Sequence, residues 1–173
     1  MEPSLTALTT TRLHLLKLSQ QQLELSLSDL PKLEEQLDMT IAHEFFTERV
    51  QRAIRMKVEK MRAVDVSQHG WFTYWLIIIK EENIGAGMLG FKGYLNEEGS
   101  TEFGYGIDSA YQNKGYMSEA VKALADWAFS NPFCKVITAT EVYNAASKRL
   151  LEKLGATQTE DNEKFTSWEL RKR

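Results

Sequence analysis

The sequence predicts an α+β (mixed α/β) fold, with a twisted mixed sheet of about six or seven strands flanked by helices. Three aromatic, β-branched or glycine-rich segments, 72–80, 84–94 and the strand from Thr101, are joined by short turns. Such a run predicts an antiparallel meander. A helix over 116–129 and a strand over 135–142 follow. A strand–helix–strand crossover implies that the last strand lies parallel to the Thr101 strand.

The segment before the meander is mostly helical. In Arg12–Leu18, leucines alternate with polar residues except at Leu16, which predicts a first strand. Ser19 is the expected cap of a helix over 20–27, and Asp29 with Pro31 opens a second helix. A long amphipathic helix from Glu44 to Val64 follows from apolar residues spaced three or four apart, namely Phe46, Val50, Ile54, Val58 and Met61.

The segment after the meander has its own stop signals. The 116–129 helix ends at Asn131-Pro132, and a shorter helix opens at Asn144 and ends at the C-cap Gly155. Residues 157–171 predict a hairpin that turns at Asp161-Asn162.

Composition sets broad limits on function. The 173 residues are 43% apolar and 26% charged, with a net charge of −3, which predicts one globular domain over 1–173 and no general nucleic-acid binding. Cys134 is the single cysteine, and the three histidines are far apart in the sequence, so we expect no disulfide and no metal site. The N-terminus lacks the pattern of a signal peptide and no apolar run is long enough for a membrane span, so we expect a cytoplasmic protein.

The turn Gln112-Asn113-Lys114-Gly115-Tyr116-Met117 feeds directly into the 116–129 helix. A helix start offers unpaired N–H groups and the positive end of the helix dipole, which suit a phosphate. Gly115 allows a ligand to approach the backbone closely. A glycine-bearing turn is common on its own, but Gly104 and Gly106 in the preceding strand favour a ligand that runs alongside it.

Three motifs in order give a more specific signal. They are Glu102-Phe103-Gly104-Tyr105, then the Gln112–Met117 turn, then Asn144 with Ser147 followed by Leu151-Glu152-Lys153-Leu154-Gly155. This arrangement resembles the GNAT superfamily of acetyl-CoA-dependent N-acetyltransferases, and within it the branch of the ribosomal-protein N-terminal acetyltransferases RimJ and RimL. The first half of the chain matches by topology alone. Met117 and Ala156 depart from the family pattern, the first at the turn and the second after the closing glycine.

The resemblance implies a GNAT fold with acetyl-CoA as cofactor, coenzyme A as product and no metal. Pantetheine would contact the backbone at Ile107, Asp108 and Ser109. Asn144 would hydrogen-bond the cofactor, act as a plain helix cap, or do both. The pyrophosphate would lie on the turn residues Gln112, Asn113, Lys114, Gly115, Tyr116, Met117 and Ser118.

The resemblance also implies catalytic roles. Glu102 would accept the amine proton, or is a half-exposed strand residue; the two readings are equally favoured. Leu151 stands where many GNAT enzymes have a tyrosine, so Ser147 would donate a proton to the thiolate, or pack under the cofactor. Tyr105 and Tyr143 are reserve donors. A backbone N–H of the Tyr105–Ile107 strand would polarise the carbonyl.

We therefore expect transfer of an acetyl group to a primary amine, with a protein N-terminal α-amine as the first candidate. Transfer would be direct, in a ternary complex, because Cys134 lies at the wrong end of its strand. A small amine (polyamine, aminoglycoside or amino acid) and a non-catalytic acyl-CoA-binding module are the alternatives, and a homodimer stays open. The acidic 24–48 segment, with Phe45 and Phe46, suits a cationic amine or forms a solvated helix face; the solvated face is favoured.

Overall fold

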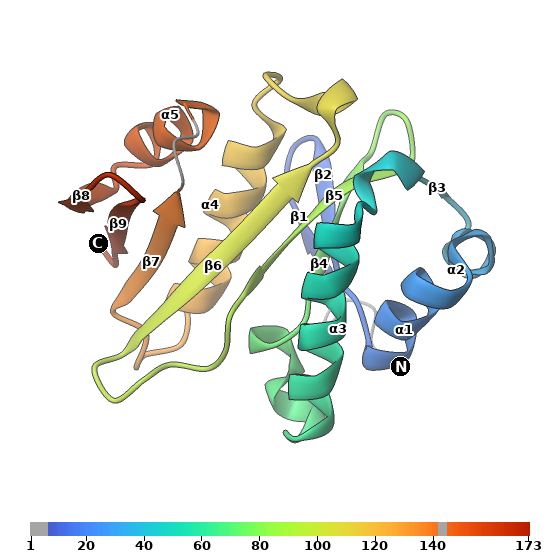
Figure 1. Ribbon diagram of the computed structural model, residues 1–173, viewed down its shortest axis with the longest axis horizontal. Coiled ribbons are helices and arrows are strands. Elements are labelled where there is room, and N and C mark those ends of the chain that lie inside the picture. Colours follow the sequence, from blue (N-terminus) through green and yellow to red (C-terminus); the bar gives the residue numbers. More distant parts are fainter. Residues whose placement is uncertain (1–6, 142–144) are drawn as a thin grey trace.

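The computed structural model describes residues 7–141 and 145–173. Within them, nine strands form one sheet in the order β1-β2-β4-β5-β6-β7-β9-β8, and β3 pairs beside β5 (Figure 1). The strands are β1 (Ala7–Thr9), β2 (Leu13–Lys17), β3 (Thr40–Ile41), β4 (Trp75–Ile79), β5 (Ile84–Phe91), β6 (Ser100–Ile107), β7 (Val136–Glu141), β8 (Thr157–Asp161) and β9 (Thr166–Arg171).

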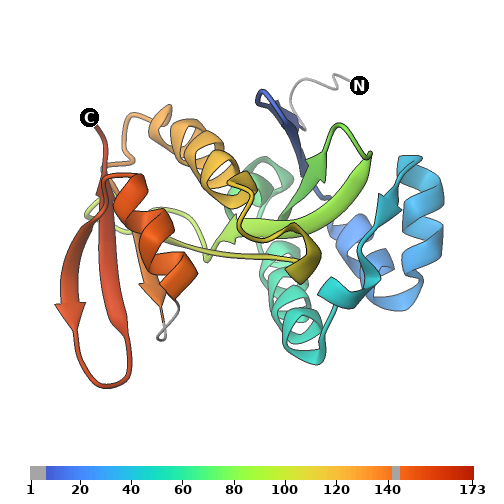
Figure 2. The same ribbon diagram turned by 90° about the horizontal axis from the view of Figure 1, so that it is seen from above.

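Helices cover both faces of this sheet, α1 to α3 on one and α4 on the other (Figure 2). They are α1 (Gln20–Ser28), α2 (Leu30–Leu37), α3 (Glu48–Arg62), α4 (Tyr116–Phe129) and α5 (Ala145–Lys153), with short 3-10 turns at His43–Phe45, Val66–Trp71 and Ser109–Tyr111. No helix of the described segments is long and apolar enough to cross a membrane.

The central strand β4 shows why both faces are covered. All five of its residues are buried. Trp75, Ile77 and Ile79 belong to the core cluster that includes α4. The alternate residues Leu76 and Ile78 belong to the cluster with α1, α2 and α3. Because strand side chains alternate between faces, a continuous apolar run requires an apolar layer on each side.

The first three helices are capped by side chains, two of them as predicted. Ser19 forms a capping box at α1, and Asp29 accepts a hydrogen bond from the Lys32 N–H at α2. The long helix α3 begins at Glu48 and not at the predicted Glu44, because Thr47 caps it and the preceding residues form a 3-10 turn. Apolar spacing alone did not locate this boundary, since Phe46 packs on the same core without being helical.

The predicted fold class is confirmed, but the sheet has nine strands where six or seven were predicted. The additional strands are β1 and β3, of three and two residues, too short for any periodicity to be recognised. The meander is antiparallel as predicted, with β5 between β4 and β6, and the C-terminal hairpin is β8–β9.

The feature that creates a site is the junction of β6 and β7. The two strands are parallel, as the crossover predicted, but they pair over three positions only, from Ser100↔Val136 to Glu102↔Thr138. Beyond that point they diverge, as the wedge between them in Figure 1 shows. The sheet is therefore open between the carboxyl ends of two neighbouring strands.

Candidate active site

The edge of β6 that faces this gap carries backbone groups without a β7 partner. The Lys92 N–H donates to the Glu102 carbonyl at 2.7 Å, and the Asp108 N–H donates to the Ala86 carbonyl at 2.8 Å. Backbone groups of alternate residues point to opposite sides of a strand, so even-numbered residues of β6 bond to β5. The backbone groups of Tyr105 and Ile107 therefore point into the gap, where an extended amide-containing ligand could pair with them.

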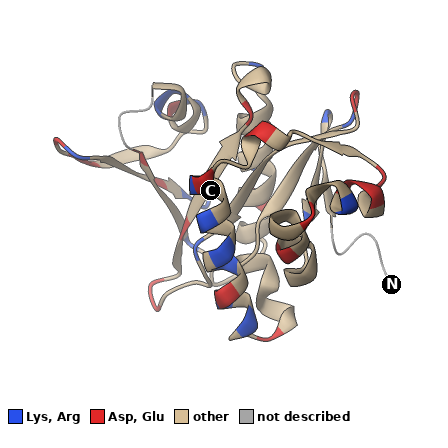
Figure 3. Ribbon diagram, turned by 45° about the vertical axis from the view of Figure 1, so that its right-hand side comes forward, with Lys and Arg blue, Asp and Glu red and all other residues tan. Residues whose placement is uncertain are grey.

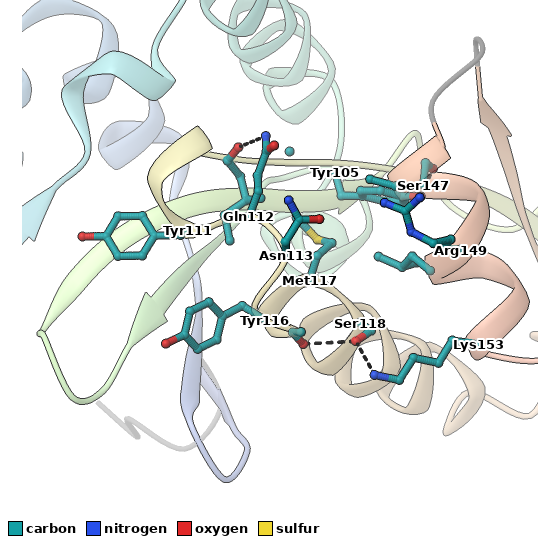
Figure 4. Close-up of a pocket in the computed structure, with 15 residues that line it drawn as sticks. Tyr105, Tyr111, Gln112, Asn113, Tyr116, Met117, Ser118, Ser147, Arg149 and Lys153 are labelled. Atoms are coloured by element: carbon teal, nitrogen blue, oxygen red, sulfur yellow. Dashed lines mark hydrogen bonds between the residues drawn. The ribbon is translucent and has the colours of Figure 1, made fainter.

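A cavity of about 400 Å³ lies between the end of β6, the start of α4 and one side of α5 (Figure 4). Nine of the residues predicted from the sequence line it: Tyr105, Ile107, Gln112, Asn113, Gly115, Tyr116, Met117, Ser118 and Ser147. The structure thus brings the predicted phosphate turn and the predicted proton donor into one space.

The start of α4 differs from those of α1 to α3. Its N-cap is Gly115, in the left-handed region at φ +82°, and no side chain of the described residues caps it. Asn113 also has a positive φ of 61°. The first-turn N–H groups of an uncapped helix have no intrahelical acceptor, and they carry the positive end of the dipole. This helix start is suited to bind an anion.

Arg12, near the N-terminus, contacts the 112–117 turn. Its Nη1 donates to the Lys114 carbonyl at 2.9 Å, and its guanidinium lies 4.5 Å from the centre of the Tyr116 ring. Its Nε is 3.4 Å from a carboxylate oxygen of Glu119 in the first turn of α4. The sequence analysis missed this residue, because nothing local to Arg12 indicates a contact about a hundred residues away.

Two cations of α5 also line the cavity, Arg149 and Lys153. Lys153 Nζ donates to Ser118 Oγ at 3.4 Å, across the space between α5 and α4 (Figure 4). They are four residues apart, so they share one helix face. That spacing was visible in the sequence, and it could have indicated that both cations face the same cavity as Ser147, which lies on the same helix.

Tyr105 and Ser147 meet at the inner end of the cavity, where their hydroxyl groups are hydrogen-bonded. Burial raises the pKa of Tyr105, the hydrogen bond to Ser147 lowers it, and the negative charge of Glu141 raises it further. The phenol therefore carries its proton at neutral pH, and the pair holds two hydroxyl hydrogens that can be donated in hydrogen bonds.

Four predicted residues lie outside the cavity lining: Glu102, Asp108, Ser109 and Lys114. Glu102 is an odd number of residues from Tyr105, so its side chain lies on the other face of β6, 3.0 Å from Lys92 Nζ. The Asp108 N–H is already bonded to Ala86, and its carboxylate caps the 3-10 turn at the Ala110 N–H. Asn144 and Tyr143 lie outside the described residues.

A mixed sheet that opens between two parallel strands, beside an uncapped helix start, is the arrangement expected of an acyltransferase that uses acyl-CoA. A family model described as "Acetyltransferase (GNAT) domain" matches residues 23–157, well over half of the chain. The chain belongs to the GNAT acetyltransferase family, and the predicted family membership is confirmed.

Curated relatives match over part of their length. The uncharacterized N-acetyltransferase YjdG of Bacillus subtilis is 34% identical over 98 residues, which are 56% of this chain and 58% of the relative. The uncharacterized N-acetyltransferase p20 of Bacillus licheniformis is 35% identical over 91 residues, 52% and 51% of the two chains. The chain thus spans a little over half the length of the curated relatives it matches.

Solved structures share the whole fold. The ribosomal-protein-S5-alanine acetyltransferase of Vibrio fischeri gives a TM-score of 0.66 at 19% identity and covers 95% of this chain and 96% of its own. RimL, a ribosomal L7/L12 α-N-protein acetyltransferase in complex with coenzyme A, gives 0.65 at 20% identity, with coverages of 94% and 95%. The acetyltransferase MccE, in complex with acetyl-CoA and AMP, gives 0.61 at 13% identity and covers 94% and 93%.

Proposed function

We propose that the protein is an acetyl-CoA-dependent N-acetyltransferase that acetylates a primary amine by direct transfer in a ternary complex. The observation that carries the proposal is the single cavity that joins the uncapped start of α4, the cations of α5 and the Tyr105–Ser147 pair. A protein N-terminal α-amine is the first candidate acceptor. The fold shared with two ribosomal-protein acetyltransferases supports this choice. A cytoplasmic location stays a prediction.

The residues present fit acetyl-CoA. The N–H groups at the start of α4, with Arg149 and Lys153, suit the pyrophosphate. The gap-facing backbone of Tyr105 and Ile107 suits the amides of pantetheine, and one of its N–H groups would polarise the thioester carbonyl. When bound, the cofactor supplies the acetyl group in activated form.

Direct transfer is supported by the state of Cys134. This side chain is fully buried, and it precedes β7 at the end remote from the gap. Burial raises the pKa of its thiol, so little nucleophilic thiolate forms at neutral pH. A covalent acetyl-cysteine at this position would also lie away from the cavity.

Ser147 is proposed as the proton donor to the leaving thiolate, held in place by Tyr105. We expect Ser147→Ala to lower kcat by about tenfold, because a thiol is a tolerable leaving group and Tyr105 stays near. Coenzyme A affinity, measured by calorimetry, should stay close to that of the wild type. Tyr105→Phe is the matched variant. If the two hydroxyl groups act as a unit, the double variant should be no slower than the slower single variant. Unchanged turnover of Ser147→Ala would refute the donor role.

The acceptor would approach the gap from the face of the sheet that α3 covers. An added Cβ at Gly104 would have no described atom within 4 Å, whereas one at Gly106 would be 3.3 Å from the Phe45 ring. Gly104 therefore marks open space on this face, between Phe45 and Glu102.

Two of the acidic side chains of the 24–48 segment are engaged by other groups of the protein. Glu34 accepts a hydrogen bond from the Ile41 N–H at 2.7 Å and contacts His43, while Glu24 pairs with Arg62 at 3.2 Å. The helix that faces the sheet, α3, carries mostly Lys and Arg among its charged residues (Figure 3). The favoured interpretation of the acidic segment, a solvated helix face, agrees with these contacts.

A coenzyme A release assay with a panel of amines tests the function. Short peptides with unblocked N-termini should be acetylated faster than spermidine, an aminoglycoside or single amino acids. Activity highest with a small amine would favour the small-molecule alternative. Binding of coenzyme A without its release, for any acceptor, would favour the binding module.

Gly104→Val should raise the acceptor KM by about tenfold, because its side chain would fill the open space through which the acceptor approaches. It should leave coenzyme A affinity unchanged.

A further inference from the structure

Glu141, the last residue of β7, is a buried carboxylate that the function described so far does not use. The residue is buried and only 7% exposed. Its Oε2 is shielded from solvent and has no hydrogen-bond partner among the described residues. A buried carboxylate oxygen without a partner is unfavourable by several kcal/mol or so, so its position calls for a functional explanation.

The strand register places Glu141 beside the Tyr105–Ser147 pair. Pairing of β6 with β7 ends at Glu102↔Thr138, and three residues further along each strand stand Tyr105 on β6 and Glu141 on β7. The negative charge of Glu141 acts on the Tyr105 hydroxyl, which is hydrogen-bonded to Ser147. A carboxylate, a phenol and an alcohol are thus neighbours where the two strands separate.

We propose that Glu141 is the catalytic base of the reaction and completes a proton relay with Tyr105 and Ser147. The inference rests on the proposed function. As the acceptor nitrogen forms its bond to the acetyl carbon, Glu141 takes the proton that the nitrogen loses. As the carbon–sulfur bond breaks, Ser147 gives its proton to the thiolate and regains one from Tyr105. Glu141 then returns its proton to Tyr105, so the relay is restored and the amine and thiol account for every proton.

The other acidic candidate, Glu102, is less suited to this step. Its carboxylate is engaged by Lys92 at 3.0 Å, and it lies at the last position where the two strands still pair, before the gap opens. Glu141 has an oxygen without a partner among the described residues, and it lies where the strands have separated. The structure therefore favours a base on β7 over the predicted base on β6.

A purely structural role for Glu141 has one concrete form. The indole Nε1 of Trp168 is likewise buried without a hydrogen-bond partner among the described residues. Trp168 lies on the neighbouring strand β9, where it pairs with Ala139 of β7, and so it is a diagonal neighbour of Glu141. A water held between indole and carboxylate would satisfy both groups without any part in catalysis. The test must separate these two roles.

Glu141→Gln keeps the shape of the side chain and removes the base. We expect kcat to fall by about a hundredfold or more, in the range for loss of a general base, with acceptor KM and coenzyme A affinity each within about threefold of wild type. Glu141→Asp, which keeps a carboxylate, should recover part of the lost kcat. Trp168→Phe is the control: it removes the indole N–H and should leave kcat near that of the wild type.

The structural role predicts the opposite pattern. Glu141→Gln and Trp168→Phe would then both lower the melting temperature and leave kcat unchanged, which would overturn the relay. If the Gln variant folds poorly, Glu141→Ala is used to distinguish the two roles. Added formate, a carboxylate small enough for the vacated space, should raise its kcat, and no rise would count against the base. If the wild type is active and the Gln variant is equally active, the relay is refuted but the proposed function is not. A wild type that releases no coenzyme A with any amine refutes the proposed function itself.

Discussion

Replacement of Gly115 by glutamate is expected to weaken coenzyme A binding by about a hundredfold or more, equivalent to about 2.7 kcal/mol. Gly115 has a φ of +82°, and it opens the α4 turn whose N–H groups line the cavity. A carboxylate there would occupy the anion site and repel the pyrophosphate from the positive end of the helix. Isothermal titration with coenzyme A measures the effect.

Gly155→Glu is the matched control for backbone strain. Gly155 follows α5 with a φ of +80°, and an added Cβ would meet an arginine, Arg173, as one at Gly115 would meet Arg12. Both variants should lose about 1–2 kcal/mol of stability, because a side chain in the left-handed region is strained. Only the Gly115 variant should lose affinity. Equal affinities for the two variants would contradict a phosphate site at the turn.

The parts of the site that the sequence predicted are those with a local cause. Gly115 and the polar residues before it determine the turn, and the apolar spacing after Met117 determines the helix, so the anion site is encoded within about a dozen residues. Ser147 was predicted through a motif on a single helix, and it lies in the cavity. Neighbours in sequence that share one element keep their spacing in the fold.

What the sequence could not predict depends on contacts between distant elements. Arg12 reaches the turn from the N-terminal hairpin, and Glu141 gains its importance only when β7 separates from β6. Asp108 was predicted to contact pantetheine through its backbone, but its N–H donates to the Ala86 carbonyl of β5. Whether the odd or the even residues of β6 point their backbone groups into the gap depends on the pairing of β6 with β5, which no local pattern specifies.

Stability is expected to depend on pH through one buried lysine, Lys57 of α3. This residue is 6% exposed, its ammonium donates to the Phe91 carbonyl, and it lies 4.9 Å from the centre of the Tyr74 ring. Burial, and to a smaller extent the charges of Lys60 and Lys92, lower the pKa of Lys57 from 10.5 to about 7. The folded protein therefore holds this proton much less tightly than the unfolded chain does.

The sign of the effect follows from proton binding. Below pH 7 both states are protonated and the folded state carries the full penalty of a buried charge. Between pH 7 and 10.5 the unfolded chain binds more protons than the folded one, so stability rises with pH. At about 1.4 kcal/mol for each pKa unit, the gain from pH 7 to pH 9.5 is about 3 kcal/mol. Burial raises the pKa of Tyr74, which has the opposite effect at higher pH, so measurements should stop near pH 9.5.

Urea unfolding of the wild type and of Lys57→Met across this range isolates the lysine, because all other titrating groups are common to both proteins. We expect the wild type to gain about 3 kcal/mol relative to the Met variant as the pH rises from 7 to 9.5. Lys60→Met, which removes a charge on the same helix that acts on Lys57, should make this gain smaller and leave its direction unchanged. Parallel pH profiles for wild type and Lys57→Met would show that the buried ammonium keeps its ordinary pKa, stabilised by the Phe91 carbonyl and the Tyr74 ring.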